Sequence, residues 1–436
     1  MQDTANKVTE FLREKQMLSD DIDMERNCRL FLDEMQKGLE DTDSSLSMIP
    51  TYIETDIDIP SDKPVVVADA GGTHFRVATV SFDRQKTAKI ENFQSYSMPG
   101  TEQNVTKQEF FALMASYMDK VLDASNSIGF CFSYPTDILP NKDGRLVRFS
   151  KEIKAKQVRG QLIGENLNLA INAAGHPEKK HVVILNDTVT TLLAGKSVAG
   201  SRDFSAYIGF ILGTGTNCCY SEKNCNITKN KDLDPTKNQI INIESGSFAK
   251  VPRGQIDLEF DNSTLDPGMS TFEKMISGAY LGPLCLEVAR AAAAESLFSS
   301  ETAEKLNVID QIDTKDISDF MHDPRGDNPL AVALADASQD DIDTLDCLID
   351  KLVDRAAKLT AINLSSVVLK TGAGENPDFP VCVVAEGSTF YGLKTLKERV
   401  EDYLTQYLEN QKQRYFEIVS VENATLIGAA IAGLTN

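Results

Sequence analysis

The residues of this 436-residue chain that could perform chemistry lie where short apolar runs end. One such group is Asn186-Asp187-Thr188, which follows the apolar run at 182–185. A carboxylate held at the end of a buried strand can accept the proton of a hydroxyl that is about to react. Asp187 is therefore the candidate general base, and Asn186 could bind a neighbouring hydroxyl. The alternative is a structural Asx turn or helix cap, which Asn and Asp also favour.

Two glycine-containing turns follow similar runs, at 65–69 and 206–212, and together favour a bound polyphosphate. Their candidate contacts are Asp69, Gly71, Gly72, Thr73, Gly213 and Thr214. Glycines let the backbone approach phosphate oxygens and point N–H groups at them, and the threonine hydroxyls can add donors. Asp69 could hold Mg²⁺ through a water molecule. Either turn alone is also what an ordinary β-hairpin contains.

Five further polar residues stand in or beside apolar segments. Ser133 and Ser150 could bind hydroxyls, and Lys151 could neutralise charge on a phosphoryl group in transfer. Asn217 and Glu244 each lie near an apolar strand run. Considered singly, each has a plain structural explanation: a solvated surface lysine, a turn residue or an exposed carboxylate at a strand end.

These residues need a scaffold that brings the strand ends together. Short β-branched runs predict strands, and amphipathic spacing predicts helices. The predicted strands are 65–69, 75–82, 182–185, 206–212 and 381–385, and the predicted helices are 110–124, 341–364 and much of the first 40 residues. This alternation indicates an α/β protein with its chemistry at the strand ends.

Length and composition agree with an α/β enzyme and exclude other classes of protein. A chain of 436 residues predicts two domains or one divided domain. The formal net charge of −21 would repel nucleic acid and anionic membranes, so neither is an expected partner. The eight cysteines lack zinc-type spacing, and no apolar run resembles a signal sequence or membrane span. We therefore expect a cytoplasmic protein with reduced thiols, whose oligomeric state stays open.

In order and spacing, these segments resemble the hexokinase family, the eukaryotic-type hexokinases and glucokinases. The resemblance covers nearly the whole chain. The segments that carry it are 31–35 with 48–52, 69–76, 132–135, 185–188, 212–217, 274–282 and 386–390. One such segment would be weak evidence, whereas seven in the family's order make coincidence negligible.

The resemblance implies a two-domain actin-like ATPase (ribonuclease H-like) fold with a cleft between the domains. The small domain would comprise 64–190 and 422–436, because the C-terminal helix, here roughly 423–434, returns to it. The large domain would comprise 1–63 and 191–421. Position in the segments implies that Asp187 is the general base and Lys151 its electrostatic partner.

The implied reaction moves the terminal phosphate of Mg-ATP to the 6-hydroxyl of glucose or a related hexose. The residues implied to hold the sugar are Ser133, Ser150, Asn186, Asn217 and Glu244. Those implied to line the nucleotide are Gly71, Gly72, Thr73, Thr214, Gly387 and Ser388. Hexose and Mg-ATP are thus the expected partners.

Three departures from the family pattern concern the choice of sugar. Pro283 follows Tyr-Leu-Gly where the family carries a glutamate, His74 stands where Asn is common, and Lys151 precedes Glu-Ile rather than Gly-Phe. If that glutamate is a sugar ligand, its loss removes a charge-assisted hydrogen bond of about 1.5–3 kcal/mol. Kinases for fructose, mannose or N-acetylhexosamine therefore stay open. So do a catalytically weak sugar sensor and an actin- or chaperone-like ATPase.

Overall fold

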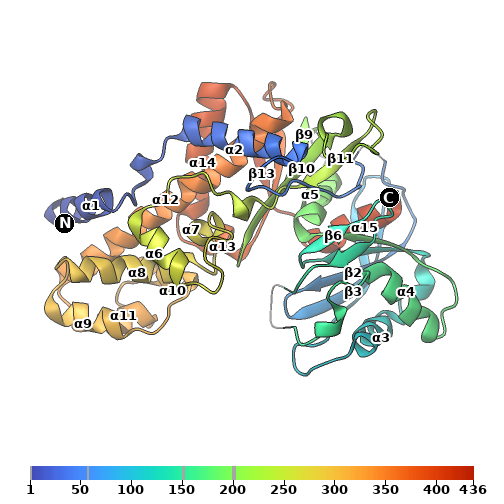
Figure 1. The fold of residues 1–436 in the computed structure, drawn as a ribbon, viewed down its shortest axis with the longest axis horizontal. Helices are drawn as coiled ribbons and strands as arrows, with labels where there is room; N and C mark the ends of the chain where they lie inside the picture. Colours follow the sequence, from blue (N-terminus) through green and yellow to red (C-terminus); the bar gives the residue numbers. More distant parts are fainter. Residues whose placement is uncertain (1, 56–57, 150–152, 199–202) are drawn as a thin grey trace.

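Two β-sheets in separate lobes organise the chain (Figure 1). The computed structural model describes residues 2–55, 58–149, 153–198 and 203–436. The N-terminus lies at the far end of the larger, mostly helical lobe, whereas the C-terminus lies in the other lobe (Figure 1).

The first sheet has five strands in the order β4-β3-β2-β5-β8. They are β2 (Val65–Gly71), β3 (His74–Phe82), β4 (Ala88–Ser97), β5 (Ser127–Phe132) and β8 (His181–Leu185). β2 pairs antiparallel with β3 and parallel with β5, and β5 pairs parallel with β8. Residues 65–70 are all buried, as expected for a central strand that is covered on both faces.

The second sheet has six strands in the order β1-β11-β10-β9-β12-β13. They are β1 (Ile49–Pro50), β9 (Ala206–Leu212), β10 (Thr216–Lys223), β11 (Asn238–Asn242), β12 (Val381–Glu386) and β13 (Phe416–Val419). Three antiparallel strands, β11-β10-β9, are followed by two parallel ones, as in the first sheet. This duplication is the arrangement of the two-domain actin-like ATPase fold. A separate ribbon joins β6 (Thr136–Ile138) to β7 (Gly144–Leu146).

Helices cover both sheets and build most of the larger lobe (Figure 1). The α-helices are α1 (Gln2–Glu14), α2 (Met24–Glu40), α3 (Lys107–Met118), α4 (Ile163–Ala173), α5 (Asp187–Val198), α6 (Gln255–Ser263), α7 (Glu273–Ile276), α8 (Leu281–Ala294), α9 (Ser300–Val308), α10 (Thr314–His322), α11 (Pro329–Ala333), α12 (Gln339–Thr371), α13 (Ser388–Gly392), α14 (Leu396–Leu404) and α15 (Ala424–Thr435). A π-helix at Thr405–Lys412 extends α14. Among the described residues, no helix is both long and apolar enough to cross a membrane.

A hydrophobic core between the two sheets connects the lobes. α5 and α15 form its centre, and residues of β2, β3, β10 and β12 pack around them. The helices touch closely, because a Cβ on Gly428 of α15 would lie only 1.8 Å from the Thr190 carbonyl oxygen of α5. A Cβ on Gly129 of β5 would lie 1.8 Å from the Ala429 carbonyl oxygen. A displacement of α15 is therefore passed to α5 and to the first sheet.

The predicted strands and helices are confirmed, and the differences lie at their ends. The helix predicted at 110–124 begins earlier as α3, because Thr106 caps it by accepting the Glu109 N–H, and it stops at Met118. The helix predicted at 341–364 runs from 339 to 371 and is capped by Ser338. The first 40 residues form two helices rather than one pattern. α15 contacts β2 and β5 of the first sheet, while the proposed domain boundaries stay a prediction.

Candidate active site

Asp187 is the first residue of α5, and only Asn186 separates it from the end of β8. α5 also packs against β9, β10 and β12, so Asp187 lies where the two lobes meet. Its Oδ1 accepts the Thr188 N–H at 2.8 Å. Burial raises the pKa of the Asp187 carboxyl, the Thr188 hydrogen bonds oppose this, and the nearby Asp69 carboxylate raises the pKa further. A raised pKa makes a carboxylate a stronger proton acceptor.

The first glycine turn connects β2 to β3 and is open to solvent at its tip. Gly71 and Gly72 are half-buried, and Thr73 is exposed. Asp69 precedes this turn, is 1% exposed, and pairs through Oδ2 with Arg76 at 3.0 Å. The Thr425 hydroxyl of α15 donates to the same oxygen at 3.0 Å. The turn is thus anchored at its base while its backbone faces the outside.

The second glycine turn connects β9 to β10 and is joined to two distant segments. The Gly278 N–H donates to the Gly213 carbonyl at 2.8 Å, and the Thr389 hydroxyl donates to the same oxygen at 2.9 Å. Gly387 has φ +122°, and a Cβ there would lie 2.2 Å from the Leu212 carbonyl oxygen. Only glycine fits this position. The predicted nucleotide residues of the second lobe are therefore neighbours, and Thr214 and Ser388 are exposed beside them.

Asn217 and Glu244 form one polar cluster at the ends of β10 and β11. The Asn217 amide donates to Glu244 Oε1 at 3.4 Å, and the Asn242 amide donates to the same atom at 2.7 Å. Burial raises the pKa of the Glu244 carboxyl, and the Asp187 carboxylate raises it as well. Glu244, which follows β11, and Asp187, which follows β8, are thus within range of each other's charge.

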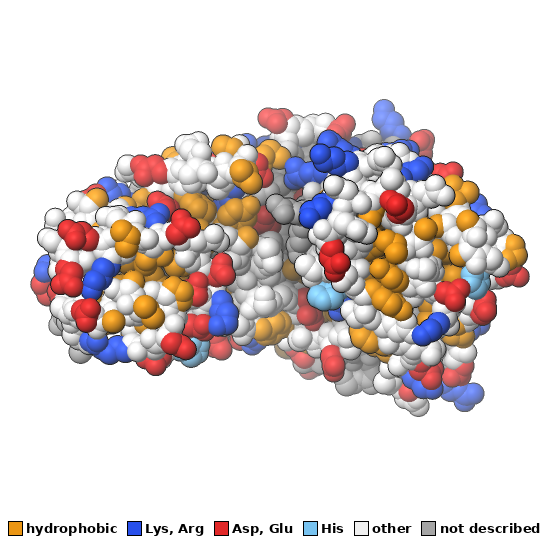
Figure 2. Space-filling model, turned by 90° about the horizontal axis from the view of Figure 1, so that it is seen from below, with side chains coloured by type: hydrophobic (Ala, Val, Ile, Leu, Met, Phe, Trp, Pro, Cys, Tyr) orange, Lys and Arg blue, Asp and Glu red, His pale blue; other side chains and the backbone are white. Residues whose placement is uncertain are grey.

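Of the four remaining predicted residues, the structure places two, Ser133 and Asn186, next to Asp187 or in its hydrogen-bond network. Ser133 follows β5, donates its N–H to the Ala70 carbonyl at 3.1 Å, and its hydroxyl helps to lower the pKa of Asp187. Asn186 accepts the Thr188 N–H through Oδ1 at 2.7 Å. Ser150 and Lys151 lie outside the described residues. The surface is hollowed between the two lobes (Figure 2).

Glu273 is a further acidic residue of the site that sequence reasoning missed. It begins α7, and its Oε2 accepts the Thr216 N–H at 2.8 Å directly behind the second glycine turn. Burial raises the pKa of the Glu273 carboxyl, and the Glu244 carboxylate raises it further. Glu273 immediately precedes the family-like segment 274–282, and this position was the one sequence signal that could have pointed to it. It follows no strand, so a search of strand ends does not find it.

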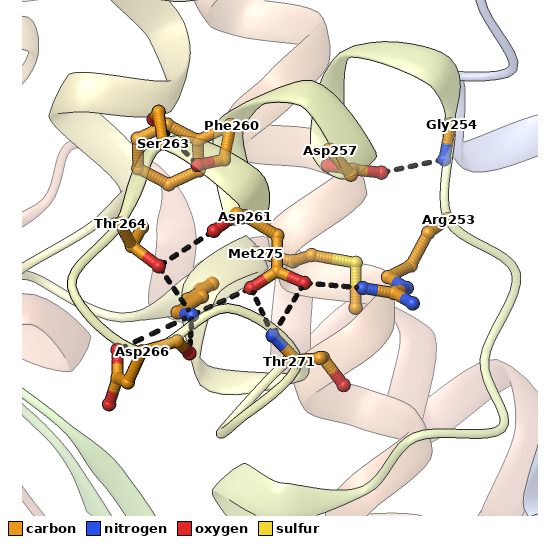
Figure 3. Close-up of polar contacts among 12 residues, drawn as sticks. Arg253, Gly254, Asp257, Phe260, Asp261, Ser263, Thr264, Asp266, Thr271 and Met275 are labelled. Atoms are coloured by element: carbon orange, nitrogen blue, oxygen red, sulfur yellow. Dashed lines mark hydrogen bonds and ion pairs between the residues drawn. The ribbon is translucent and has the colours of Figure 1, made fainter.

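Polar contacts of Asp261 with Arg253, Thr264 and their neighbours hold the loop before Glu273 (Figure 3). Lys274 Nζ donates to Asp261 Oδ1 at 2.6 Å, to the Thr264 hydroxyl at 2.8 Å and to the Asp266 carbonyl at 2.8 Å. Arg253 binds the other Asp261 oxygen at 2.9 Å. Because both charges of the Lys274–Asp261 pair are nearly inaccessible, the pair fixes the loop and with it the start of α7.

Two departures from the family pattern have different surroundings. Pro283 is the third residue of α8, and its neighbour Gly282 packs against Asp313 and Thr314 at the start of α10. His74 is exposed beside the first glycine turn, with its Nδ1 2.9 Å from the Thr73 hydroxyl oxygen. The start of α8 around Pro283 thus packs against α10, whereas Glu273 bonds to Thr216 at the second glycine turn.

The fold and the site together define a member of the two-domain actin-like ATPase class. Two hexokinase family models match the chain, one over residues 7–197 and the other over residues 207–435. The second alone covers more than half of the 436 residues. The chain belongs to the hexokinase family.

Individual relatives agree with this assignment. The chain is 31% identical to glucokinase-1 of Kluyveromyces lactis over 395 residues, which cover 79% of this chain and 80% of that protein. It is 30% identical to human hexokinase-2 over 395 residues, covering 86% of this chain but 42% of that protein. The chain thus spans less than half the length of the mammalian hexokinase-2 relatives. A hexokinase structure from Schistosoma mansoni, complexed with glucose, superimposes with TM-score 0.79 at 25% identity over 99% of both chains.

Proposed function

We propose that this protein transfers the terminal phosphate of ATP to the 6-hydroxyl of glucose or a related hexose. The observation that supports this most is that β2, β5 and β8 pair side by side and parallel, so that Asp69 and Asp187 lie at the same edge of the first sheet, and the Asp187 charge also acts on Glu244. A proton acceptor between a phosphate site and a hydroxyl-binding cluster is what phosphoryl transfer to an alcohol needs. The glucose in the Schistosoma mansoni hexokinase structure agrees with a hexose as the acceptor.

Each part of the site has a distinct task in this proposal. Asp187 takes the proton of the 6-hydroxyl as that oxygen attacks the terminal phosphorus, and ADP leaves as its bond to that phosphorus breaks. Ser133, Asn186, Asn217 and Glu244, with Ser150, hold the other hydroxyls. Lys151 offsets the negative charge that develops on the transferred phosphoryl group.

Glu273 supplies the extra carboxylate that the family resemblance located at position 283. It lies beside Glu244, and its Oε2 already orients the Thr216 N–H next to Asn217. Pro283, at the start of α8, has no side-chain hydrogen-bonding group. In this proposal Glu273 takes the place of the glutamate that Pro283 replaces.

The nucleotide lies between the glycine turns of the two lobes. Its proposed contacts are Gly71, Gly72, Thr73, Gly213, Thr214, Gly387 and Ser388. Asp69 is the residue that would hold the Mg²⁺ of Mg-ATP, and it would do so through water, since its Oδ2 is bound by Arg76 and Thr425. When bound, the ion neutralises phosphate charge.

Sugar binding closes the two lobes over the reacting groups. The moving parts are the small domain, 64–190 with 422–436, and the large domain, 1–63 with 191–421. Closure excludes water, which would otherwise accept the phosphate. Solution scattering should therefore show a smaller radius of gyration with hexose than without it. A cytoplasmic location remains part of the proposal.

The test is a coupled ADP-release assay with Mg-ATP and a panel of glucose, fructose, mannose and N-acetylglucosamine. At least one hexose should stimulate ADP release strongly. Asp187→Ala should abolish turnover and leave hexose affinity, measured by calorimetry, within about tenfold, because the general base contributes to the reaction more than to binding. ATP hydrolysis that is indifferent to every sugar, or normal turnover in Asp187→Ala, would refute the proposal.

A further inference from the structure

The backbone of Glu244 adopts a left-handed conformation, with φ 59° and ψ 49°. This conformation is unfavourable for a residue with a Cβ and persists only where the surroundings hold it. Glu244 is followed by the 3-10 turn Ser245–Ser247, which turns the chain sharply after β11. The direction of the Glu244 carboxylate therefore depends on what anchors this turn.

Ser245 is the anchored residue of the turn. Its side chain is completely buried, and its N–H donates to Asn217 Oδ1 at 3.3 Å. Its hydroxyl oxygen accepts a hydrogen bond from Asn363 Nδ2 at 3.2 Å. Asn363 lies in α12, 118 residues away in sequence, and is also completely buried. The turn is thus tied on one side to the sugar cluster and on the other to the longest helix.

Asn363 differs from Thr360 and Ser366 of the same helix in the partner that its side chain binds. The Thr360 and Ser366 hydroxyls donate to carbonyl oxygens one turn earlier in α12 itself, at 2.9 and 2.6 Å. Asn363 instead bonds outside its helix, while its Oδ1 has no hydrogen-bond partner among the described residues. A buried, half-satisfied amide is unfavourable for folding. The bond to Ser245 ties α12 to the turn that follows Glu244.

We propose that Asn363 is a positioning residue of the sugar site. Through Ser245 it holds Glu244 in the left-handed conformation that directs the carboxylate toward Asn217 and Asn242. In this role Asn363 acts on hexose affinity through Ser245 and Glu244 and leaves the nucleotide turns unchanged. The inference rests on the proposed role of Glu244 in hexose binding.

The test compares two substitutions that remove the same hydrogen bond from opposite ends. Asn363→Leu removes the donor at similar side-chain volume, and Ser245→Ala removes the acceptor with a smaller change in packing. Each should raise the hexose Kd about three- to tenfold, the range expected from one hydrogen bond, without changing the KM for Mg-ATP. The hexose Kd of the double variant should be no higher than the higher of the two single-variant values, because both substitutions remove the same hydrogen bond. Calorimetry is the suitable assay, since the chain contains no tryptophan.

Asn27→Leu is the matched control. Asn27 is 1% exposed, donates through Nδ2 to the Asp23 carbonyl at 2.7 Å, and also has an unpaired Oδ1 among the described residues. It lies in α2 and should leave the hexose Kd unchanged. Wild-type hexose affinity in Asn363→Leu and Ser245→Ala would overturn the inference, and so would an equal loss in Asn27→Leu. If the wild-type protein binds no hexose, the proposed function itself is refuted.

Discussion

Gly428→Ala tests the contact between α15 and the helix that carries Asp187. In an unhindered helix interior, alanine is favoured over glycine by about 1 kcal/mol. Here the new Cβ would lie 1.8 Å from the Thr190 carbonyl oxygen. Ordinary contact begins at about 3.4 Å, so the two helices must separate by about 1.6 Å, the difference between these distances. Overpacking of this kind destabilises by about 1–3 kcal/mol, so packing should outweigh helix propensity.

The same displacement should reach the general base. The Thr190 hydroxyl donates to the Asp187 carbonyl oxygen at 2.6 Å, within the first turn of α5. A misplacement of about 1 Å in a catalytic group can lower the rate about 100-fold. We therefore expect Gly428→Ala to lower kcat about 100-fold and to lower the melting temperature by about 1 °C for each kcal/mol lost in a chain of 436 residues.

The assay is ADP release with the preferred hexose, combined with thermal unfolding. Gly392→Ala is the control, because its Cβ would meet no atom within 4 Å at the end of α13, and it should change neither quantity. A Gly428→Ala protein with wild-type kcat and an equal or higher melting temperature would show that the helices can separate freely. That result would refute the reasoning.

Three more predictions concern the buried acids and thiols. Because burial raises the pKa of Asp187, the native protein loses stability as the pH rises through the raised pKa. Asp187→Asn should abolish turnover yet unfold at a higher temperature than the wild type, and the difference in melting temperature should widen from about pH 4 upward. Equal melting temperatures at every pH would contradict this. Pro283→Glu should change the hexose KM by less than about twofold, whereas Glu273→Gln should raise it at least about tenfold. If steady-state kinetics instead show the larger change in KM for Pro283→Glu, position 283 is the sugar ligand. Iodoacetamide should label the exposed Cys225 first, and activity should be retained. The reason is that Cys131 is buried and its pKa is raised well above the ordinary value. Early labelling of Cys131, detected by mass spectrometry, would disprove this.

The strand-end residues could be predicted because their position depends on local sequence. Apolar β-branched runs such as 65–69 and 206–212 mark where strands stop, and the residue type that follows suggests the chemistry. Parallel neighbours then bring such ends to one edge of a sheet. Asp187 and Asp69 were found in this way, and their mutual effect on pKa agrees with it.

Glu273 and Asn363 could not be predicted in this way, because their roles come from contacts between distant segments. The Glu273–Thr216 hydrogen bond spans 57 residues, and the Asn363–Ser245 hydrogen bond spans 118. In sequence, Glu273 is one acidic residue among 65, and Asn363 interrupts an apolar helix face. Only the packing of α7 and α12 behind the second sheet gives either residue its partner.

The last helix illustrates how a segment without candidate chemistry can determine the geometry of a site. α15 is apolar on nearly every side, which predicts burial but not the position of the helix. Its Thr425 hydroxyl donates to Asp69 Oδ2, and Gly428, three residues later, packs against the Thr190 carbonyl of α5. Residues three apart lie on one helix face. One face of α15 therefore contacts both the carboxylate at the first glycine turn and the helix that begins with Asp187. The position of α15 thus sets the distance between the proposed phosphate site and the proposed general base.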